Sequence, residues 1–144
     1  LLKEKNPEFL EECTRIDPVS HVFNIGFISF DNTITIFEGP MDSWLWGNSV
    51  GLCSLENKFP FEFENVQYWY DWDKAGKEKT SELLSKGHRV FNWRKFLVDH
   101  DLPINKKWDL NDLVNYLRAK KIKIKRFENY FTQEVLDLTY FMDV

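Results

Sequence analysis

Cysteine is scarce in this 144-residue sequence, and its scarcity excludes two kinds of protein. Cys13 and Cys53 are the only two, they form no CxxC pair, and no histidine stands near them at the spacing of metal ligands. A structural zinc site needs about four ligands, and a disulfide framework needs several cysteine pairs. We therefore expect neither, and we interpret both thiols as ordinary small side chains.

Long hydrophobic runs and targeting signals are missing as well. No apolar run approaches the roughly 18 residues that a transmembrane helix requires, and no signal peptide is visible. We expect a soluble, intracellular protein with no membrane partner. Because the sequence begins Leu1-Leu2 without an initiator methionine, we also interpret it as a segment of a longer protein.

The composition is that of one folded domain. The chain is 43% hydrophobic and 17% aromatic, so it can bury one core. Its formal net charge of −4 and isoelectric point near 5.4 exclude a generally basic coat for nucleic acid. A local basic surface is still compatible with this total.

Apolar and polar segments alternate along the chain in a way that predicts strands between helices. Strands are expected at residues 21–30, 33–37, 49–54, 66–70 and 89–91, with a lysine-protected edge strand at 122–124. Helices are expected from residue 6, at 40–46, from the DWD motif to residue 87, at 94–98, after residue 109 and at 132–141. The alternation predicts an α/β fold with a central, mostly parallel sheet and helices on both faces.

Four carboxylates stand where two of the predicted strands end. Glu38 and Asp42 follow the first strand, and Asp71 and Asp73 follow another. Acids in such places are often helix caps or solvated turn residues. In open α/β sheets, however, sites form beyond the carboxyl ends of the strands, so the four acids converge if these strands are neighbours. Converging carboxylates repel one another unless a cation neutralises them, and their oxygens suit Mg²⁺ or Mn²⁺.

Three stretches carry a resemblance to a known family. They are EGPMDSWLWGNSVGLCS at 38–54, DWDKAGKEKTSELLSKGHRV at 71–90 and KWDLNDL at 107–113. Together they resemble the Toprim domain of bacterial and phage DNA primases, a domain that topoisomerases, recombination factors and certain nucleases also contain. The resemblance covers roughly residues 23–117. It implies a Toprim fold, with residues 1–30 as a leading helix and strand, 31–126 as the core and 127–144 as a C-terminal helix of the same domain.

The resemblance also implies an activity and its residues. The activity is nucleotidyl transfer, in which RNA primers are made on single-stranded DNA with two Mg²⁺ or Mn²⁺ ions. Asp71, Asp73 and Asp109 would bind metal, Glu38 would be a ligand or the acid-base residue, and Asp42 would complete the catalytic pair with Glu38. The implied partners are the DNA template, ribonucleoside triphosphates and a replicative helicase, and the implied location is the cytoplasm, that of the host cell if a phage encodes the chain.

The sequence departs from the family pattern in two places and leaves other functions open. Trp72 stands between the two aspartates where Asn is common, and Trp108 separates Lys107 from Asp109. The zinc-binding module and the basic N-terminal subdomain of such primases are not in this sequence, so we expect the segment alone to fall short of full primer synthesis. A Toprim nuclease, or a noncatalytic module that binds a helicase through residues 130–141, are the alternatives.

Cations and aromatic residues supply the candidates for nucleotide contact. Lys74, Lys77 and Lys79 lie at the start of the helix after the DWD motif, where cations oppose the helix dipole unless they meet phosphates. Lys107, Asn111 and Trp72 complete the predicted nucleotide and nucleic-acid contacts, with Asn111 in the place of the second acid of the third motif. The Lys and Ile alternation at 120–126 fits a protected edge strand or a nucleic-acid ribbon. Three tryptophans are expected in the core: Trp44, Trp46 and Trp69.

Overall fold

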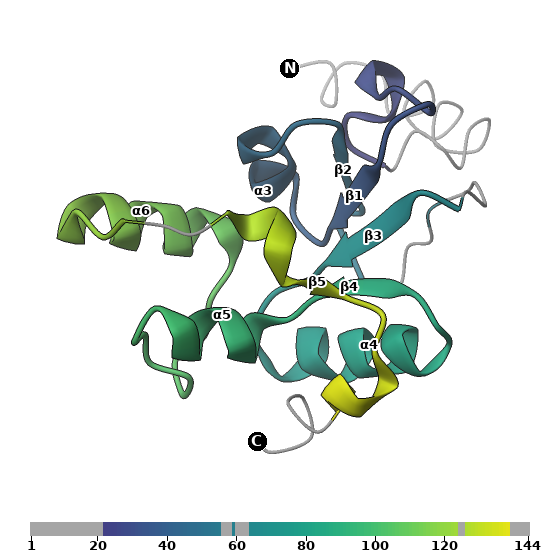
Figure 1. Ribbon diagram of the computed structural model, residues 1–144. Coiled ribbons are helices and arrows are strands. Elements are labelled where there is room, and N and C mark those ends of the chain that lie inside the picture. The colour runs from purple at the N-terminus through teal and green to yellow at the C-terminus, as the bar shows by residue number, and fades with distance from the viewer. Residues whose placement is uncertain (1–21, 56–58, 60–63, 124–125, 139–144) are drawn as a thin grey trace, which may run out of the picture.

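The sheet of this α/β protein has five strands in the order β2-β1-β3-β4-β5 (Figure 1). The computed structural model describes residues 22–55, 59, 64–123 and 126–138. The strands are β1 (Ile34–Phe37), β2 (Ser49–Gly51), β3 (Val66–Trp69), β4 (Arg89–Phe91) and β5 (Phe131–Thr132). The helices are α3 (Pro40–Leu45), α4 (Lys74–Ser85), α5 (Trp93–Asp99) and α6 (Leu110–Lys120), with 3-10 turns η2 (Ile25–Phe27), η3 (Phe127–Tyr130) and η4 (Val135–Leu138).

The sheet is mostly parallel, as the sequence predicts. β1 pairs in parallel with both β2 and β3, and β3 pairs in parallel with β4. Only the short edge strand β5 is antiparallel, and it pairs with β4. The crossover connection between two parallel strands of a sheet is right-handed. In the strand order, β2 lies on one side of β1 and β4 lies on the other side of β3, so the two connections run in opposite directions across the sheet. The helices of these two crossovers, α3 and α4, therefore lie on opposite faces of the sheet.

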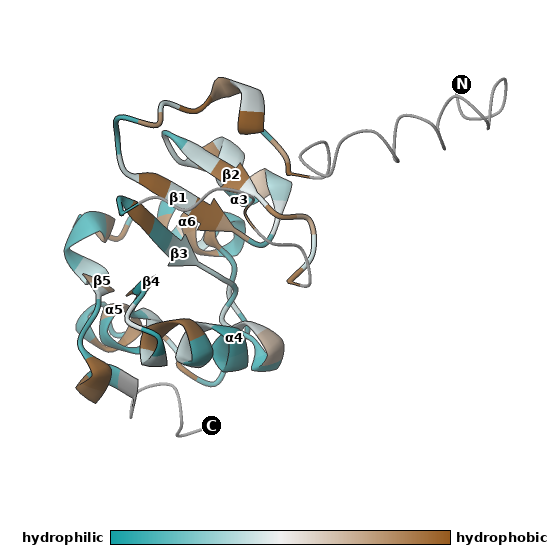
Figure 2. Ribbon diagram, turned by 90° about the vertical axis from the view of Figure 1, so that its right-hand side faces the viewer, coloured by the Kyte–Doolittle hydropathy of each residue, from teal (hydrophilic) through white to brown (hydrophobic). Residues whose placement is uncertain are grey.

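The core forms around the central strands because their side chains are apolar on both faces. All four residues of β1 are buried, which is the pattern of a strand covered on both sides. Trp69 of β3 stacks on Phe91 of β4 with their ring centroids 3.9 Å apart. The brown of hydrophobic residues runs along β1 and β2 in Figure 2, whereas α4 is mostly hydrophilic.

Side-chain caps fix where three of the helices begin. Asp73 accepts a hydrogen bond from the Gly76 amide at the start of α4, and Asn92 accepts one from the Lys95 amide at the start of α5. Asp109 caps α6 in the same way through the Asp112 amide. Each cap satisfies an amide that has no partner within its helix. Two of the predicted metal ligands, Asp73 and Asp109, are therefore also helix caps.

The structure corrects three of the predicted elements. Residues 22–30 form no long strand: Asn24 is left-handed, with φ at 70°, η2 follows it, and Phe23 alone bridges to Gly51. The described residues 121–123 are not in a strand, and the edge position belongs to β5, which extends the sheet beyond the predicted 31–126 core. Thr132 lies in β5, and the short η4 is the helical element within the described residues 133–138, so the helix predicted at 132–141 does not begin at Thr132. The helix predicted from residue 6 lies outside the described residues.

Candidate functional site

Two acids come together at the carboxyl ends of the strands because β1 and β3 are neighbours in the sheet. Glu38 follows β1 directly, and Asp71 lies two residues beyond β3. The two strands are parallel and Phe37 lies opposite Trp69, so the residues that follow each strand lie at the same end of the sheet. This is the crevice in which open α/β sheets hold their sites.

A third acid joins this pair from α3 and connects it to α6. Asp42 lies in the first turn of α3 and is only 4% exposed. Its Oδ1 accepts a hydrogen bond from the backbone amide of Asn111 at 3.0 Å. The contact joins residues 69 positions apart in the sequence. The first motif is thus held against the third.

A pair of tryptophans brings the second motif to the third. The Trp72 amide donates to the Trp108 carbonyl oxygen at 2.6 Å, and the Trp108 amide returns a bond to the Trp72 carbonyl oxygen at 3.3 Å. Both indole rings are buried, and their Nε1 groups donate to the carbonyl oxygens of Ile104 and Pro103, respectively, at 2.9 Å. This two-residue bridge, which we call the tryptophan bridge, holds the DWD loop beside the loop that carries Asp109.

Gly76 allows the start of α4 to press against the DWD loop. A Cβ atom on this residue would lie 2.0 Å from the carbonyl oxygen of Asp71. That distance is far inside van der Waals contact, so only glycine fits without a shift of the backbone. Gly76 is helical, and its role is close packing beside Asp71.

Burial, and with it the convergence of acids, raises the pKa values of four carboxyls. Burial and the charges of Glu38, Asp42, Asp109 and Asp73 raise the pKa of Asp71 to about 8. Burial, and then the neighbouring acids, raise that of Asp42 to about 6 against the opposing Asn111 hydrogen bond. The pKa of Glu38 is raised by burial and by Asp73, and that of Asp109 mainly by burial. The charges of the three motifs therefore act on one another.

The donor set fits a hard divalent cation, although the side chains do not enclose one as they lie. Within the described ranges, no three histidine, cysteine or carboxylate side chains form a group that could hold a metal ion. Glu38 nevertheless has a buried Oε2 atom with no hydrogen-bond partner. A buried carboxylate oxygen without a donor is costly, and a cation would relieve both that cost and the mutual repulsion of the acids. Carboxylate oxygens are the ligands that Mg²⁺ and Mn²⁺ prefer.

The predicted nucleotide contacts differ in where the structure places them. Lys74 and Lys107 are exposed, and the Lys77 ammonium lies 4.1 Å from the centre of the Trp72 ring. Burial lowers the pKa of Lys77. Asn111 lies at the site, with its amide bonded to Asp42. Trp72 is 3% exposed and packed in the core, where it supports the site, and its contact with a base stays a prediction.

The sequence does not predict the exposure of Trp44. The tryptophan is predicted to lie in the core with Trp46 and Trp69, yet 74% of its surface is exposed. Trp69 is buried as predicted, and Trp46 is half-buried against it. Met41, Trp44 and Leu45 have the spacing of an apolar helix face, and nothing in that pattern distinguishes a covered face from an open one.

Comparisons with known proteins add no family assignment. A scan against protein-family models and a search of the curated proteins found no match to this chain. In the described part of the chain, no helix is both long enough and apolar enough to span a membrane.

Proposed function

We propose that this chain is the Toprim catalytic domain of a phage-type DNA primase, which joins ribonucleotides into primers on a single-stranded DNA template. The observation that carries the proposal is the convergence of three separate sequence motifs on one edge of a parallel sheet. Glu38 and Asp42, Asp71 and Asp73, and Asp109 come from these motifs and act on one another electrostatically. The α/β architecture with its mostly parallel sheet supports the same family.

The lack of close ion pairs to the acids among the described residues supports a catalytic role over a purely structural one. In the described residues, the ion pairs within 4.0 Å are those of Glu82 with Lys79 and Lys86, and none involves the five acids of the site. A scaffold gains nothing from buried acids that raise one another's pKa values, whereas perturbed carboxyls in a crevice are typical of functional sites. The cluster therefore favours an enzyme over a helicase-binding module.

Each residue of the site has its own role in the proposed reaction. Asp71, Asp73, Asp109 and Glu38 would hold Mg²⁺ or Mn²⁺, and two such ions would neutralise the charge that develops as the primer 3′-hydroxyl displaces pyrophosphate from an incoming nucleotide. As the alternative to binding an ion, Glu38, with its unpartnered Oε2 and raised pKa, is suited to take the proton of that hydroxyl. Asp42 keeps α6 in place through Asn111. The exposed Lys74 and Lys107 are available to the triphosphate.

Titration with Mn²⁺ tests the proposal directly. We expect calorimetry to show binding to the wild-type chain and at least a tenfold loss of affinity in Asp71→Asn/Asp73→Asn, since both acids would be ligands. Asp31→Asn, an exposed acid outside the site, is the control and should bind as the wild type does. Equal binding by all three proteins would contradict the assignment.

A product assay separates the primase from the nuclease. With the longer protein, labelled ribonucleotides and a single-stranded template, a primase makes oligoribonucleotides that grow from a 3′ end. A nuclease shortens the template instead, because its acids direct water to a phosphodiester. Primer formation that requires Asp71 and Asp73 would support the proposal, and template cleavage alone would replace it with the nuclease.

A further inference from the structure

Basic residues are concentrated in one short part of this acidic chain. Residues 113–127 contain six of the 19 lysines and arginines and none of the 23 aspartates and glutamates, although the whole chain has a net charge of −4. Four of the six lie at the C-terminal end of α6 and just beyond it. We call them the basic tip: Arg118, Lys120, Lys121 and Lys123. We propose that the basic tip binds the phosphates of single-stranded DNA and that the DNA lies along α6, between the tip and the acid site. The acid site is the group of five acids described above: Glu38, Asp42, Asp71, Asp73 and Asp109.

Protection of a sheet edge does not explain the basic tip. Lysines on an edge strand prevent pairing with other chains, and the sequence pattern fits that role. In the structure, the edges of the sheet are β2 and β5, and the described residues 121–123 belong to no strand. The lysines therefore lie where no edge needs protection.

The helix dipole explains only part of the cluster. Cations in the last turn of a helix are stabilised by its dipole, and Arg118 and Lys120 are in that turn. Lys121 ends the helix in a left-handed conformation with φ at 53°, and Lys123 lies beyond it. The dipole effect falls off within the last turn, so it gives no reason for Lys123.

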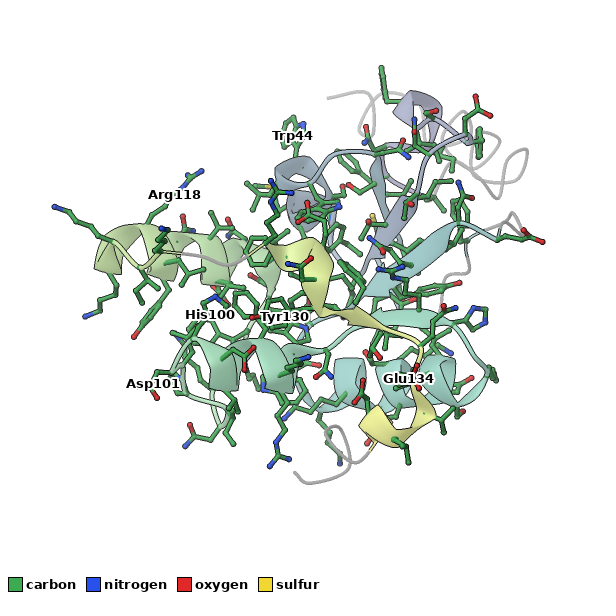
Figure 3. The ribbon with its side chains drawn as sticks, in the orientation of Figure 1. Trp44, His100, Asp101, Arg118, Tyr130 and Glu134 are labelled. Atoms are coloured by element: carbon green, nitrogen blue, oxygen red, sulfur yellow. The ribbon has the colours of Figure 1, made fainter. Side chains whose placement is uncertain are left out.

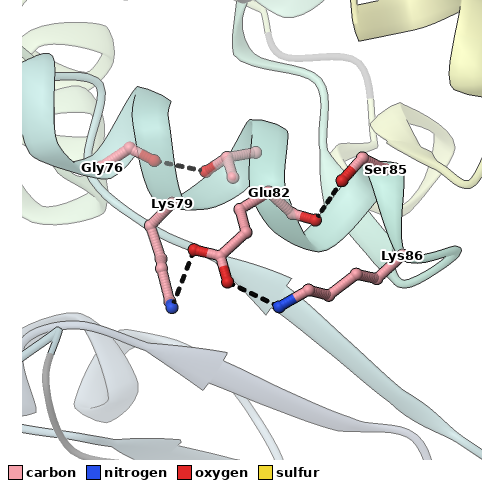
Figure 4. A network of polar contacts seen from close by, with 6 residues as sticks. Gly76, Lys79, Glu82, Ser85 and Lys86 are labelled. Carbon is pink, nitrogen blue, oxygen red and sulfur yellow. Dashed lines mark hydrogen bonds and ion pairs between the residues drawn. The ribbon is translucent and has the colours of Figure 1, made fainter.

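The cations of the tip are exposed and not in ion pairs, unlike a matched pair on α4. All four members of the tip are exposed, and none of the ion pairs within 4.0 Å among the described residues includes them. On α4, Lys79 and Lys86 both pair with Glu82, at 3.1 and 2.6 Å (Figure 4). Glu82 thus compensates two cations of α4, whereas the charge of the tip is left for a partner.

Local packing holds the tip in place. The Ile122 amide donates to the Leu117 carbonyl oxygen at 3.1 Å, and the Ile122 side chain packs against the core. Lys121 and Lys123 on either side of it remain exposed. The alternation of Lys and Ile therefore anchors the chain through Ile122 and presents the lysines to solvent.

Helix α6 connects the tip to the acid site. It begins at Asp109, beside the Asp42–Asn111 contact, and extends away from the sheet (Figure 1). Its 11 residues span about 16 Å, the length of roughly five phosphates at the spacing of one strand of a duplex. Asn111, Asn115 and Arg118 follow one another at helical spacing on one face, and the Asn115 amide group donates to the Asn111 side-chain oxygen at 3.4 Å. This face is a polar path between the two ends.

Trp44 supplies an aromatic surface on the neighbouring helix. It lies on α3, which packs against α6. The ring centroids of Trp44 and Phe23 are 6.2 Å apart in a T-shaped arrangement, while most of the Trp44 surface is exposed. Trp44 and Arg118 point to the same side of the molecule in Figure 3. An exposed indole suits the stacking of a base, and cations suit phosphates, which is the combination that single-stranded nucleic acids require.

Fluorescence anisotropy with a labelled dT12 oligonucleotide in EDTA tests the inference. Without metal the acid site repels phosphates, so the measurement reports the tip. We expect Arg118→Gln/Lys121→Gln to weaken binding about tenfold or more at low salt, and to make the slope of log K against log salt shallower by about 1.4, or about 0.7 for each lost phosphate contact. Lys79→Gln/Lys86→Gln removes the same charge from α4 and should change affinity less than about twofold.

Three results would overturn the inference. Equal weakening by the two double variants would mean that only net charge matters. A salt slope unchanged in Arg118→Gln/Lys121→Gln would mean that the tip touches no phosphate. Equal competition by polyglutamate and by unlabelled dT12 would identify a general polyanion site in place of a DNA site.

A second arm keeps this inference separate from the proposed function, on which it rests for its choice of partner. Asp71→Asn/Asp73→Asn should bind dT12 in EDTA at least as tightly as the wild type, because two repelling charges are gone. If the tip binds DNA while Mn²⁺ titration fails, the catalytic proposal falls and the DNA surface stands. If Mn²⁺ binds and the tip variants bind DNA like the wild type, the surface proposal falls alone.

Discussion

Asp71 is the residue at which the acid site opposes folding most clearly. Its pKa is about 8 in the folded chain, against an ordinary value of 3.8. Below pH 4 the carboxyl is protonated in both the folded and the unfolded chain. As the pH rises toward 8, the unfolded chain releases this proton first, so the native state loses stability across this window.

The variant Asp71→Asn should therefore be more thermostable than the wild type in EDTA at pH 8, because its side chain never ionises. We expect the two melting temperatures to approach each other at pH 4, and calorimetry at both pH values measures the gap. Asp31→Asn, at an exposed position, serves as the control and should show no such widening. A gap of the same size at pH 4 and pH 8 would contradict the raised pKa.

Gly76 gives a second prediction at the scale of one residue. In Gly76→Ala the new Cβ would lie 2.0 Å from the Asp71 carbonyl oxygen, so the backbone must move. We expect a loss of about 1 to 3 kcal/mol in the free energy of unfolding, measured with urea, and weaker Mn²⁺ binding. The control is Gly47→Ala, where no atom lies within 4 Å of the new Cβ and stability should change by less than about 0.5 kcal/mol. Equal effects of the two changes would contradict the packing argument.

Single residues of the site differ in how far the sequence predicts them. The convergence of the acids is predictable because carboxylates that follow parallel strands gather at one end of the sheet, although helix capping also explains Asp73 and Asp109. The tryptophans are not, because an indole suits a core, a surface or a ligand equally well. Trp44 is exposed against its prediction, and Trp72, predicted to contact a base, is buried, because burial depends on segments that are distant in the sequence.

At the scale of elements, α6 depends on its apolar stripe for its place on the body. Leu113 is fully buried, so Leu113→Ala should lose about 2 to 5 kcal/mol in the free energy of unfolding, from lost transfer energy and a cavity. Val98→Ala on α5 removes apolar atoms from a side chain that is 59% exposed and should cost far less. Urea denaturation of both variants measures the difference. A similar small loss in both would show that α6 is not held by this stripe.

Elements with strong local signals are the ones that the sequence predicts well. β1 is a short isoleucine-rich strand, and α4 and α6 each begin with a capping aspartate. The sequence patterns within residues 22–30 and 126–138 predict a strand and a helix just as plausibly, but these segments form short 3-10 turns and a two-residue strand. Their apolar residues serve contacts with distant segments, which local periodicity does not encode.

For the whole molecule, the mostly parallel sheet follows from the alternation of elements, but the order of its strands does not. β1 lies between β2 and β3, and this order places Glu38 beside Asp71. The sequence predicts convergence only on the condition that these strands are neighbours, and only long-range pairing meets that condition. The position of the basic tip likewise depends on the direction in which α6 leaves the sheet, which the sequence does not give.

The tryptophan bridge has a further consequence for how the site can be observed without substrate or metal. The Trp72 amide hydrogen is held by the Trp108 carbonyl group, and each of the two residues precedes an acid, Asp73 or Asp109. Its rate of exchange with deuterated solvent therefore reports how often the two loops separate. If this amide exchanges faster than those of β1, the acid site opens while the sheet stays folded. If the rates agree, the loops part only when the whole domain unfolds.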